Sequence, residues 1–336
     1  MSKTSVGQSA LKALDTWFHH AFFGALDRDD RNVSRHKNAI CKQLEEENNF
    51  QVMKGRFLTE IGMCNPISRS FEVSEIAHCQ QLGSWDCGLA CLIMISRWIK
   101  HELSHNGSKS GCIKFDNHSL PLTSEEVLQR HHLLRKVNTE SIWTIDLFML
   151  LNEMLHNKNG DISLNTKGSK ISCMFVSRNL GVNKNYRGLN YYKQSFRQDE
   201  RRVKRLFAQA SSTNSCMVRV SNLNLDHIVE LVSMRNIIAI ALVDNNILTK
   251  HTTKDGHSLG FFAGHFIILC GVSHKPNDLE KAIKHVDGEN IDSCFVVKNP
   301  GSECDTEFIS FKVFLESWQS LGTDQDIVFI GCPFYM

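Results

Sequence analysis

The sequence predicts an α+β protein, in which helices from the first half of the chain pack against a mainly antiparallel sheet from the second half. Two observations favour this class. Residues 88–99 and 145–155 are apolar at the spacing of buried helices. Short apolar runs that are typical of strands then dominate from residue 237 onward. Helices that are separated along the chain from an antiparallel sheet define the α+β class.

The first 69 residues predict an N-terminal extension that is partly helical. Apolar residues recur at helical spacing over residues 10–26, which favours an amphipathic helix. The charged segment over residues 27–49 is either a mobile connector or a polar helix. We therefore expect an extension over residues 1–69 and one domain over residues 70–336.

Two buried helices open the predicted domain. The first follows Cys87 over residues 88–99, and the second covers residues 145–155 with Thr144 as its N-cap. Between them, residues 101–116 are rich in Gly, Ser, His and Lys, which is typical of a surface loop.

The rest of the chain supplies the sheet and one more helix. Residues 157–166 predict a polar turn, and residues 199–210 place their apolar side chains on one helical face. Strands are predicted over residues 171–177, 237–243, 261–272, 294–297 and 326–330.

Charge and composition exclude several partners. The chain has 336 residues, is 42% hydrophobic and 22% charged, and carries a formal net charge of +2. Such a balance gives no overall field for nucleic acid or an anionic membrane, and we expect neither as a partner. The basic, aromatic segment over residues 184–205 is interrupted by Asp199 and Glu200, which favours a solvated helix face over a nucleic-acid site.

The cysteines point to a reducing compartment. Residues 1–26 lack the continuous apolar core of a signal peptide, and no stretch reaches the roughly 18 apolar residues of a spanning helix. Many of the twelve cysteines lie within apolar runs, where a free thiol behaves as a small buried hydrophobe. We expect a cytoplasmic protein, with the nucleus as the alternative.

Cys87 is the strongest candidate nucleophile. It directly precedes Gly88 and a buried helix, where unpaired backbone N–H groups and the helix dipole favour a thiolate. Gln81 lies six residues earlier and is the candidate side-chain donor for an oxyanion formed at Cys87. The residue types and their spacing favour nucleophilic catalysis.

His265 and Asn299 are the candidate base and orienting residue. Of the sixteen histidines, His265 is distinguished by its position: it follows a glycine at the start of an apolar strand. Such a strand would hold the imidazole ring rigidly. Asn299 stands at a strand end before Pro300 and Gly301. A base that serves a nucleophile needs a partner for its second ring nitrogen, and Asn299 supplies one.

Each of these residues also has a structural interpretation. A cysteine before a helix is often a packing residue, a histidine on an apolar strand a core residue, and an Asn-Pro-Gly run a turn. Together, their spacing favours a Cys87–His265–Asn299 constellation with Gln81. A weaker alternative is a structural zinc site formed by His78, Cys79, Cys87 and Cys91.

Residues 81–91 resemble the active-site signature of peptidase family C39, bacteriocin-leader peptidases with a papain-like fold. That resemblance implies a papain-like fold in which Gln81 forms the oxyanion hole, Cys87 is the nucleophile and His265 the base. Asn299 would complete the set, although the C39 family has Asp at that position. An Asn orients the imidazole but carries no charge to stabilise an imidazolium.

A wider resemblance covers residues 70–332. The chain is similar to the eukaryotic guanylyl cyclase domain-containing proteins in several segments, in order: residues 85–91, 141–147, 202–210, 264–271 and 322–327. The name of that family implies conversion of GTP to cyclic GMP. Cyclases hold two metal ions with paired aspartates. Here Asp86, Asp146 and Asp244 are isolated in the sequence, and no Walker-type glycine loop is present.

Three hypotheses follow from the sequence. The first is a cysteine hydrolase that acts on a peptide or acyl substrate and needs no cofactor. The second is a guanylyl cyclase, which would require Mg²⁺ or Mn²⁺. The third is a non-catalytic module that binds a protein partner with the same pocket.

Overall fold

The computed structural model describes residues 30–63, 76–105, 122–156, 164, 170–188, 196–212, 216–220, 223–234, 236–250, 262–273 and 293–333. The chain divides into two compact units, residues 1–45 and residues 46–336, and the second unit contains the features described below. The helix predicted over residues 10–26 lies outside the described residues, as does most of the turn over 157–166. The same holds for residues 106–116 of the predicted surface loop.

Seven described strands form one open sheet, in the order β2-β1-β7-β3-β4-β5-β6. Every neighbouring pair is antiparallel except β1 and β2, which are parallel. The predicted α+β class with a mainly antiparallel sheet is therefore confirmed. The bounds are β1 Ser172–Ser177, β2 Met217–Arg219, β3 Ile237–Asp244, β4 Gly264–Ser273, β5 Cys294–Lys298, β6 Glu307–Ser310 and β7 Ile327–Gly331.

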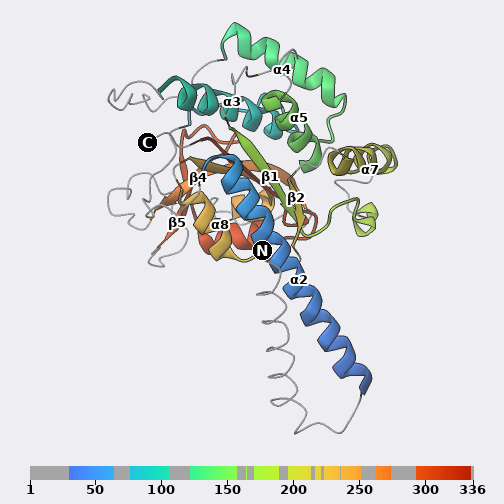
Figure 1. Ribbon diagram of the computed structural model, residues 1–336. Coiled ribbons are helices and arrows are strands. Elements are labelled where there is room, and N and C mark those ends of the chain that lie inside the picture. Colours follow the sequence, from blue (N-terminus) through green and yellow to red (C-terminus); the bar gives the residue numbers. More distant parts are fainter. Residues whose placement is uncertain are drawn as a thin grey trace. The chain divides into compact units, whose positions relative to one another are not determined.

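Helices cover both faces of the sheet, which explains why its central strands are apolar throughout (Figure 1). Alternate side chains of a strand point to opposite faces, so each strand serves two cores. On β3, for example, Ile240 and Leu242 enter one core, whereas Ala241 and Val243 enter the other. All three helices predicted for the domain pack on the first of these faces.

The first face carries α3 (Cys87–His105), α4 (Ser124–Val137), α5 (Thr144–His156) and α7 (Phe196–Ser212). The prediction that Thr144 is the N-cap of α5 is wrong. Thr144 is the first residue of the helix, and the Asp146 carboxylate accepts a hydrogen bond from the Trp143 N–H at 2.8 Å. The carboxylate of the third helical residue thus satisfies the backbone N–H of the residue before the helix.

The opposite face carries α8 (Leu225–Val232), α10 (Phe311–Trp318) and the second half of α2 (Asp30–Glu60). Of the two alternatives for residues 27–49, the polar helix is confirmed from Asp30 onward. Phe50, Phe57 and Ile61 are fully buried in the core of this face. The division into an extension over residues 1–69 and a domain from residue 70 stays a prediction.

The edge of the sheet where β3 and β5 end and β4 begins carries the candidate site. Asp244 at the end of β3 pairs with Gly264 at the start of β4, and Val243 pairs with His265. Two short elements also lie toward this edge, α9 (Asn245–Lys250) after β3 and the 3₁₀ helix η1 (Lys184–Gly188) in the segment after β1. In the part of the chain that the structure describes, no helix is both long and apolar enough to span a membrane.

Candidate active site

Cys87 is the first residue of α3, and its thiol faces the start of β4. The Phe266 N–H donates a hydrogen bond to Cys87 Sγ at 3.5 Å, and the Cys87 side chain is buried. Gly88 permits this approach, because a Cβ there would lie 3.0 Å from Leu147 and 3.1 Å from Phe266. The thiol is thus fixed beside the residue that follows His265.

His265 and Asn299 are joined directly. His265 Nε2 lies 2.8 Å from Asn299 Oδ1, and both side chains are buried. Gly301 N–H also donates to Asn299 Oδ1 at 2.9 Å, and Asn299 Nδ2 donates to Glu307 Oε2 at 3.0 Å. These two bonds fix which end of the amide faces the ring.

The orientation of the Asn299 amide decides the tautomer of His265. An amide oxygen only accepts, so Nε2 carries the proton and Nδ1 is the basic nitrogen of the neutral ring. Among the described residues, no group is hydrogen bonded to Nδ1. His265 therefore offers a free basic nitrogen on the strand that also positions Cys87 Sγ.

Glu307, at the start of β6, is a member of this network that the sequence analysis missed. Its carboxylate accepts from the Asn299 amide and raises the pKa of His265. Gly301 closes the other side, since a Cβ there would lie 3.2 Å from His265 Cε1. No sequence motif marks Glu307, because a polar residue on a short strand normally indicates a solvent-facing position.

Gln81 approaches this network through its backbone. The Gln81 N–H donates to the Pro300 carbonyl at 2.9 Å, next to Asn299. Its side-chain Nε2 donates to the Gly83 carbonyl at 2.9 Å, whereas Oε1 is buried without a hydrogen-bond partner. The structure therefore places Gln81 beside the turn that carries Asn299, and its role as an oxyanion donor stays a prediction.

Asp86 stabilises the loop that precedes Cys87. Its carboxylate accepts from Gly83 N–H at 2.9 Å and Leu82 N–H at 3.3 Å, and it forms a buried ion pair with Arg130 of α4. The loop is thereby tied to a helix on the same face of the sheet.

A second ion pair supports the segment before this loop. Arg97 donates to the His78 carbonyl at 2.6 Å and pairs with Glu126 at 2.7 Å. His78 Nε2 in turn lies 2.9 Å from the Asn299 carbonyl oxygen. The segment before Cys87 therefore contacts the turn at Asn299 twice, through His78 and through the backbone of Gln81.

Burial sets the protonation states of the pair. It raises the pKa of the Cys87 thiol, and the backbone N–H groups of Phe266, Gly88 and Cys87 oppose that shift only in part. Burial also lowers the pKa of His265, against the bond to Asn299 and the charge of Glu307. Both shifts favour the neutral pair, a thiol and an uncharged imidazole, and oppose the effect of the α3 dipole on Cys87.

The zinc alternative is wrong. His78, Cys79, Cys87 and Cys91 all belong to the described residues, within which no group of three or more His, Cys, Asp or Glu residues is arranged to hold a metal ion.

The three aspartates that are isolated in the sequence each interact with a residue outside the candidate site. Asp86 pairs with Arg130 and Asp146 with Arg202, while Asp244 accepts from the Ser320 hydroxyl at 2.9 Å. Each of these aspartates thus has a local structural partner.

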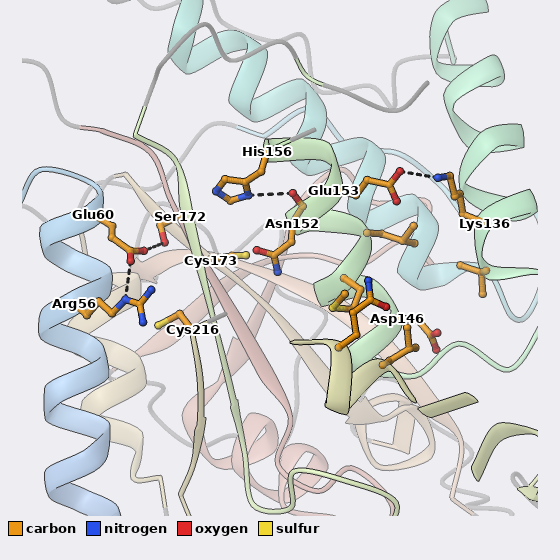
Figure 2. Close-up of a pocket in the computed structure, with 15 residues that line it drawn as sticks. Arg56, Glu60, Lys136, Asp146, Asn152, Glu153, His156, Ser172, Cys173 and Cys216 are labelled. Carbon is orange, nitrogen blue, oxygen red and sulfur yellow. Dashed lines mark hydrogen bonds and ion pairs between the residues drawn. The ribbon is translucent and has the colours of Figure 1, made fainter. Parts of the chain in front are cut away.

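A cavity of about 720 Å³ is lined by residues of α2, α4, α5, α7 and β1, Asp146 among them, and by Cys216 just before β2 (Figure 2). Its charged walls are paired with one another, Arg56 with Glu60 at 2.8 Å and Lys136 with Glu153 at 2.6 Å. Burial raises the pKa of the Cys216 thiol in its lining to about 12. None of the four predicted site residues lines this cavity.

Comparisons with known proteins identify the family. The family model described as Guanylylate cyclase matches residues 76–330. The chain is similar to Guanylyl cyclase 1 of Arabidopsis thaliana, with 26% identity over 263 residues, which is 76% of each protein. No solved structure matches the chain significantly. Since the family model covers well over half of the chain, including all the residues of the candidate site, this protein belongs to the Guanylylate cyclase family.

Proposed function

We propose that the chain is a cysteine hydrolase of papain-like architecture, with Cys87 as nucleophile, His265 as base and Asn299 as the residue that orients the base. The observation that carries the proposal is the bond between His265 Nε2 and Asn299 Oδ1, which leaves Nδ1 as the basic nitrogen of the residue next to Phe266, whose N–H contacts Cys87 Sγ.

The arrangement of elements supports the architecture. The nucleophile begins a buried helix, strand β4 supplies the base, and the orienting residue directly follows the adjacent antiparallel strand β5. A catalytic unit of this kind is defined by its geometry and the roles of its residues, and unrelated folds share it. The likeness to papain-like peptidases rests on this arrangement and on the sequence around Cys87.

The proposed reaction is acyl transfer to water. As Cys87 Sγ attacks the carbonyl carbon of a peptide or acyl compound, its proton passes to His265 Nδ1. Collapse of the tetrahedral intermediate expels the leaving group, which takes that proton. Water then attacks the thioester and gives a proton to Nδ1, and Cys87 recovers it as the carboxylic acid departs.

Backbone N–H groups and Gln81 are the proposed oxyanion donors. The N–H groups of Cys87 and Gly88 lie at the start of α3, where helix N–H groups lack partners within the helix. Gln81 Nε2 carries a second hydrogen besides the one donated to Gly83, and a rotation of the side chain would direct it toward Cys87. Such donors stabilise the developing oxyanion.

Acylation of Cys87 tests the proposal. The purified protein is incubated with a panel of activated acyl esters and peptide thioesters, and intact-mass and peptide mass spectrometry follow adduct formation. We expect an acyl adduct on Cys87 that water removes with turnover. The adduct should be lost in Cys87→Ala and slowed at least tenfold in His265→Ala. The absence of any adduct on Cys87 across the panel would contradict the proposal.

A guanylyl cyclase is the second candidate, favoured by the name of the family and of the Arabidopsis relative. It requires residues that bind GTP and divalent metal ions. Formation of cyclic GMP from GTP with Mg²⁺ or Mn²⁺, undiminished in Cys87→Ala, would favour this candidate over the hydrolase. If neither activity is present, the remaining hypothesis is a protein-binding module.

A further inference from the structure

A cavity of about 670 Å³ lies at the sheet edge near the end of β1, away from Cys87. Three segments form it: the loop after β1 together with η1, the end of β2, and the turn between α10 and β7. Basic and amide side chains dominate its lining, and the residues that carry the argument are Arg178, Asn183, Lys184, Arg219, Asp324 and Gln325.

Gln325 provides an unsatisfied acceptor in this lining. Its side chain is 9% exposed, and its Oε1 is buried without a hydrogen-bond partner. A buried acceptor without a partner carries a free-energy cost. A ligand that donates an O–H or N–H hydrogen bond would remove this cost.

The turn that presents Gln325 is held in an unusual conformation. Asp324 and Gln325 have φ values of 50° and 53°, in the left-handed region that residues other than glycine rarely occupy. The Asp324 carboxyl accepts from the Tyr186 hydroxyl and from Asn183 Nδ2 at 3.1 Å. Arg178 N–H donates to the Asp324 carbonyl at 2.8 Å. These bonds fix the turn against the loop after β1.

The charges around the cavity favour an anion. Arg178, Lys184 and Arg219 are its basic lining residues, and Asp324 is its acidic one. Within the described part of the chain, the side chains of Arg178 and Lys184 make no hydrogen bond or ion pair. Arg219 donates to the Arg178 carbonyl at 3.2 Å and lies 3.9 Å from Glu46. The cavity therefore combines two exposed cations with a buried acceptor, although the charge of Arg178 also acts on Asp324 and that of Lys184 on Glu200.

We propose that this cavity binds a small phosphate ester that carries hydroxyl groups. The phosphate lies between Arg178 and Lys184, which form charge-assisted hydrogen bonds with its oxygens. A hydroxyl group of the ligand donates to Gln325 Oε1. The volume suits a ligand of the size of a sugar phosphate, and the site is independent of the reaction at Cys87.

Calorimetric titration of the full-length protein with ribose 5-phosphate, ribose and inorganic phosphate tests the proposal. We expect ribose 5-phosphate to bind, and to bind at least tenfold more tightly than either ribose or phosphate. Arg178→Ala and Lys184→Ala should each weaken the binding of ribose 5-phosphate about tenfold, since each removes a charge-assisted hydrogen bond to the phosphate. Gln325→Leu should reduce ribose 5-phosphate to the affinity of inorganic phosphate.

Arg201→Ala is the matched control, because Arg201 is an exposed basic residue of α7 outside the cavity. It should leave binding unchanged. Arg178 and Lys184 are exposed, so their variants should fold, and circular dichroism verifies this. No binding of ribose 5-phosphate at 10 mM, or equal losses in Arg178→Ala and Arg201→Ala, would overturn the proposal.

Discussion

The Asn299 amide connects a buried imidazole to a carboxylate. Asn carries no charge, which by itself would leave an imidazolium at His265 poorly stabilised. Glu307 compensates, because its carboxylate accepts a hydrogen bond from Asn299 and raises the pKa of His265. Glu307 thus adds to the site a negative charge that Cys87, His265 and Asn299 do not themselves supply.

Replacing Glu307 should therefore lower the pKa of His265. In Glu307→Gln the hydrogen bond to Asn299 can persist, whereas the negative charge is lost. We expect the imidazole to titrate at lower pH than in the wild-type protein, as measured by NMR of the histidine ring. Glu303→Gln, an exposed neighbour on the same connection, is the control. An unchanged titration in Glu307→Gln would show that the carboxylate does not act on His265.

The Asp86–Arg130 pair should be important for stability. Both side chains are buried, so Arg130→Met leaves an uncompensated carboxylate. Loss of one partner of a buried pair costs about 3–5 kcal/mol. Urea denaturation should show this loss, and the double variant Asp86→Asn/Arg130→Met should recover part of it. A loss below about 1 kcal/mol in Arg130→Met would mean that the pair contributes little.

At the scale of elements, the start of α3 depends on close packing. Gly88→Ala places a Cβ about 3 Å from Leu147 and Phe266, neither of which can move freely in the core. Overpacking of this kind costs about 1–3 kcal/mol. We expect a lower free energy of unfolding and slower acylation of Cys87, because the helix must shift away from β4.

Gly55→Ala is the matched comparison within α2. Nothing lies within 4 Å of a Cβ at Gly55, which is exposed. Alanine there should stabilise the protein by about 0.5–1 kcal/mol through helix propensity. Equal effects of the two substitutions on stability would contradict the packing argument for Gly88.

The elements that sequence analysis predicted are those with strong apolar periodicity. The buried face of α3 gives apolar residues at helical spacing. β3, β4 and β5 give continuous apolar runs, because helices cover both faces of the central sheet. β2 has three residues and β6 four, too few for a period to be recognised. α4 was also missed, since charged residues dominate it and its buried Arg130 and Glu126 are satisfied by partners distant in sequence.

The candidate site shows a similar division. Cys87, His265 and Asn299 were predicted because each stands where an apolar element begins or ends, and the structure brings all three to one region. Glu307 was not, because its significance depends on the pairing of β6 with β5 rather than on any local pattern. The effect of burial on the pKa of Cys87 was also not predicted, since the degree of burial is a property of the assembled core.

For the molecule as a whole, a buried carboxyl should shape the pH dependence of stability. Burial and the neighbouring Asp324 raise the pKa of Asp326 to about 8. An unfolded carboxyl titrates near about 3.9. Between these values the folded state binds more protons, so this group makes stability fall as pH rises, by up to about 1.4 kcal/mol per pH unit.

Asp326→Asn should remove that contribution. We expect the variant to lose less stability than the wild-type protein between pH 5 and pH 8, and to exceed it at pH 8. Urea denaturation at several pH values measures both effects. Parallel stability profiles for the two proteins would show that Asp326 titrates normally in the folded state.

The most direct test of the account is the alkylation rate of each cysteine at pH 7, resolved by mass spectrometry. If Cys87 and His265 act as a thiol–imidazole pair, Cys87 should react with iodoacetamide at least as fast as the exposed Cys304, despite its burial. The rate should fall about tenfold in His265→Ala. A Cys87 that reacts as slowly as the buried Cys91, with no effect of His265→Ala, would contradict the central claim that this constellation is chemically active.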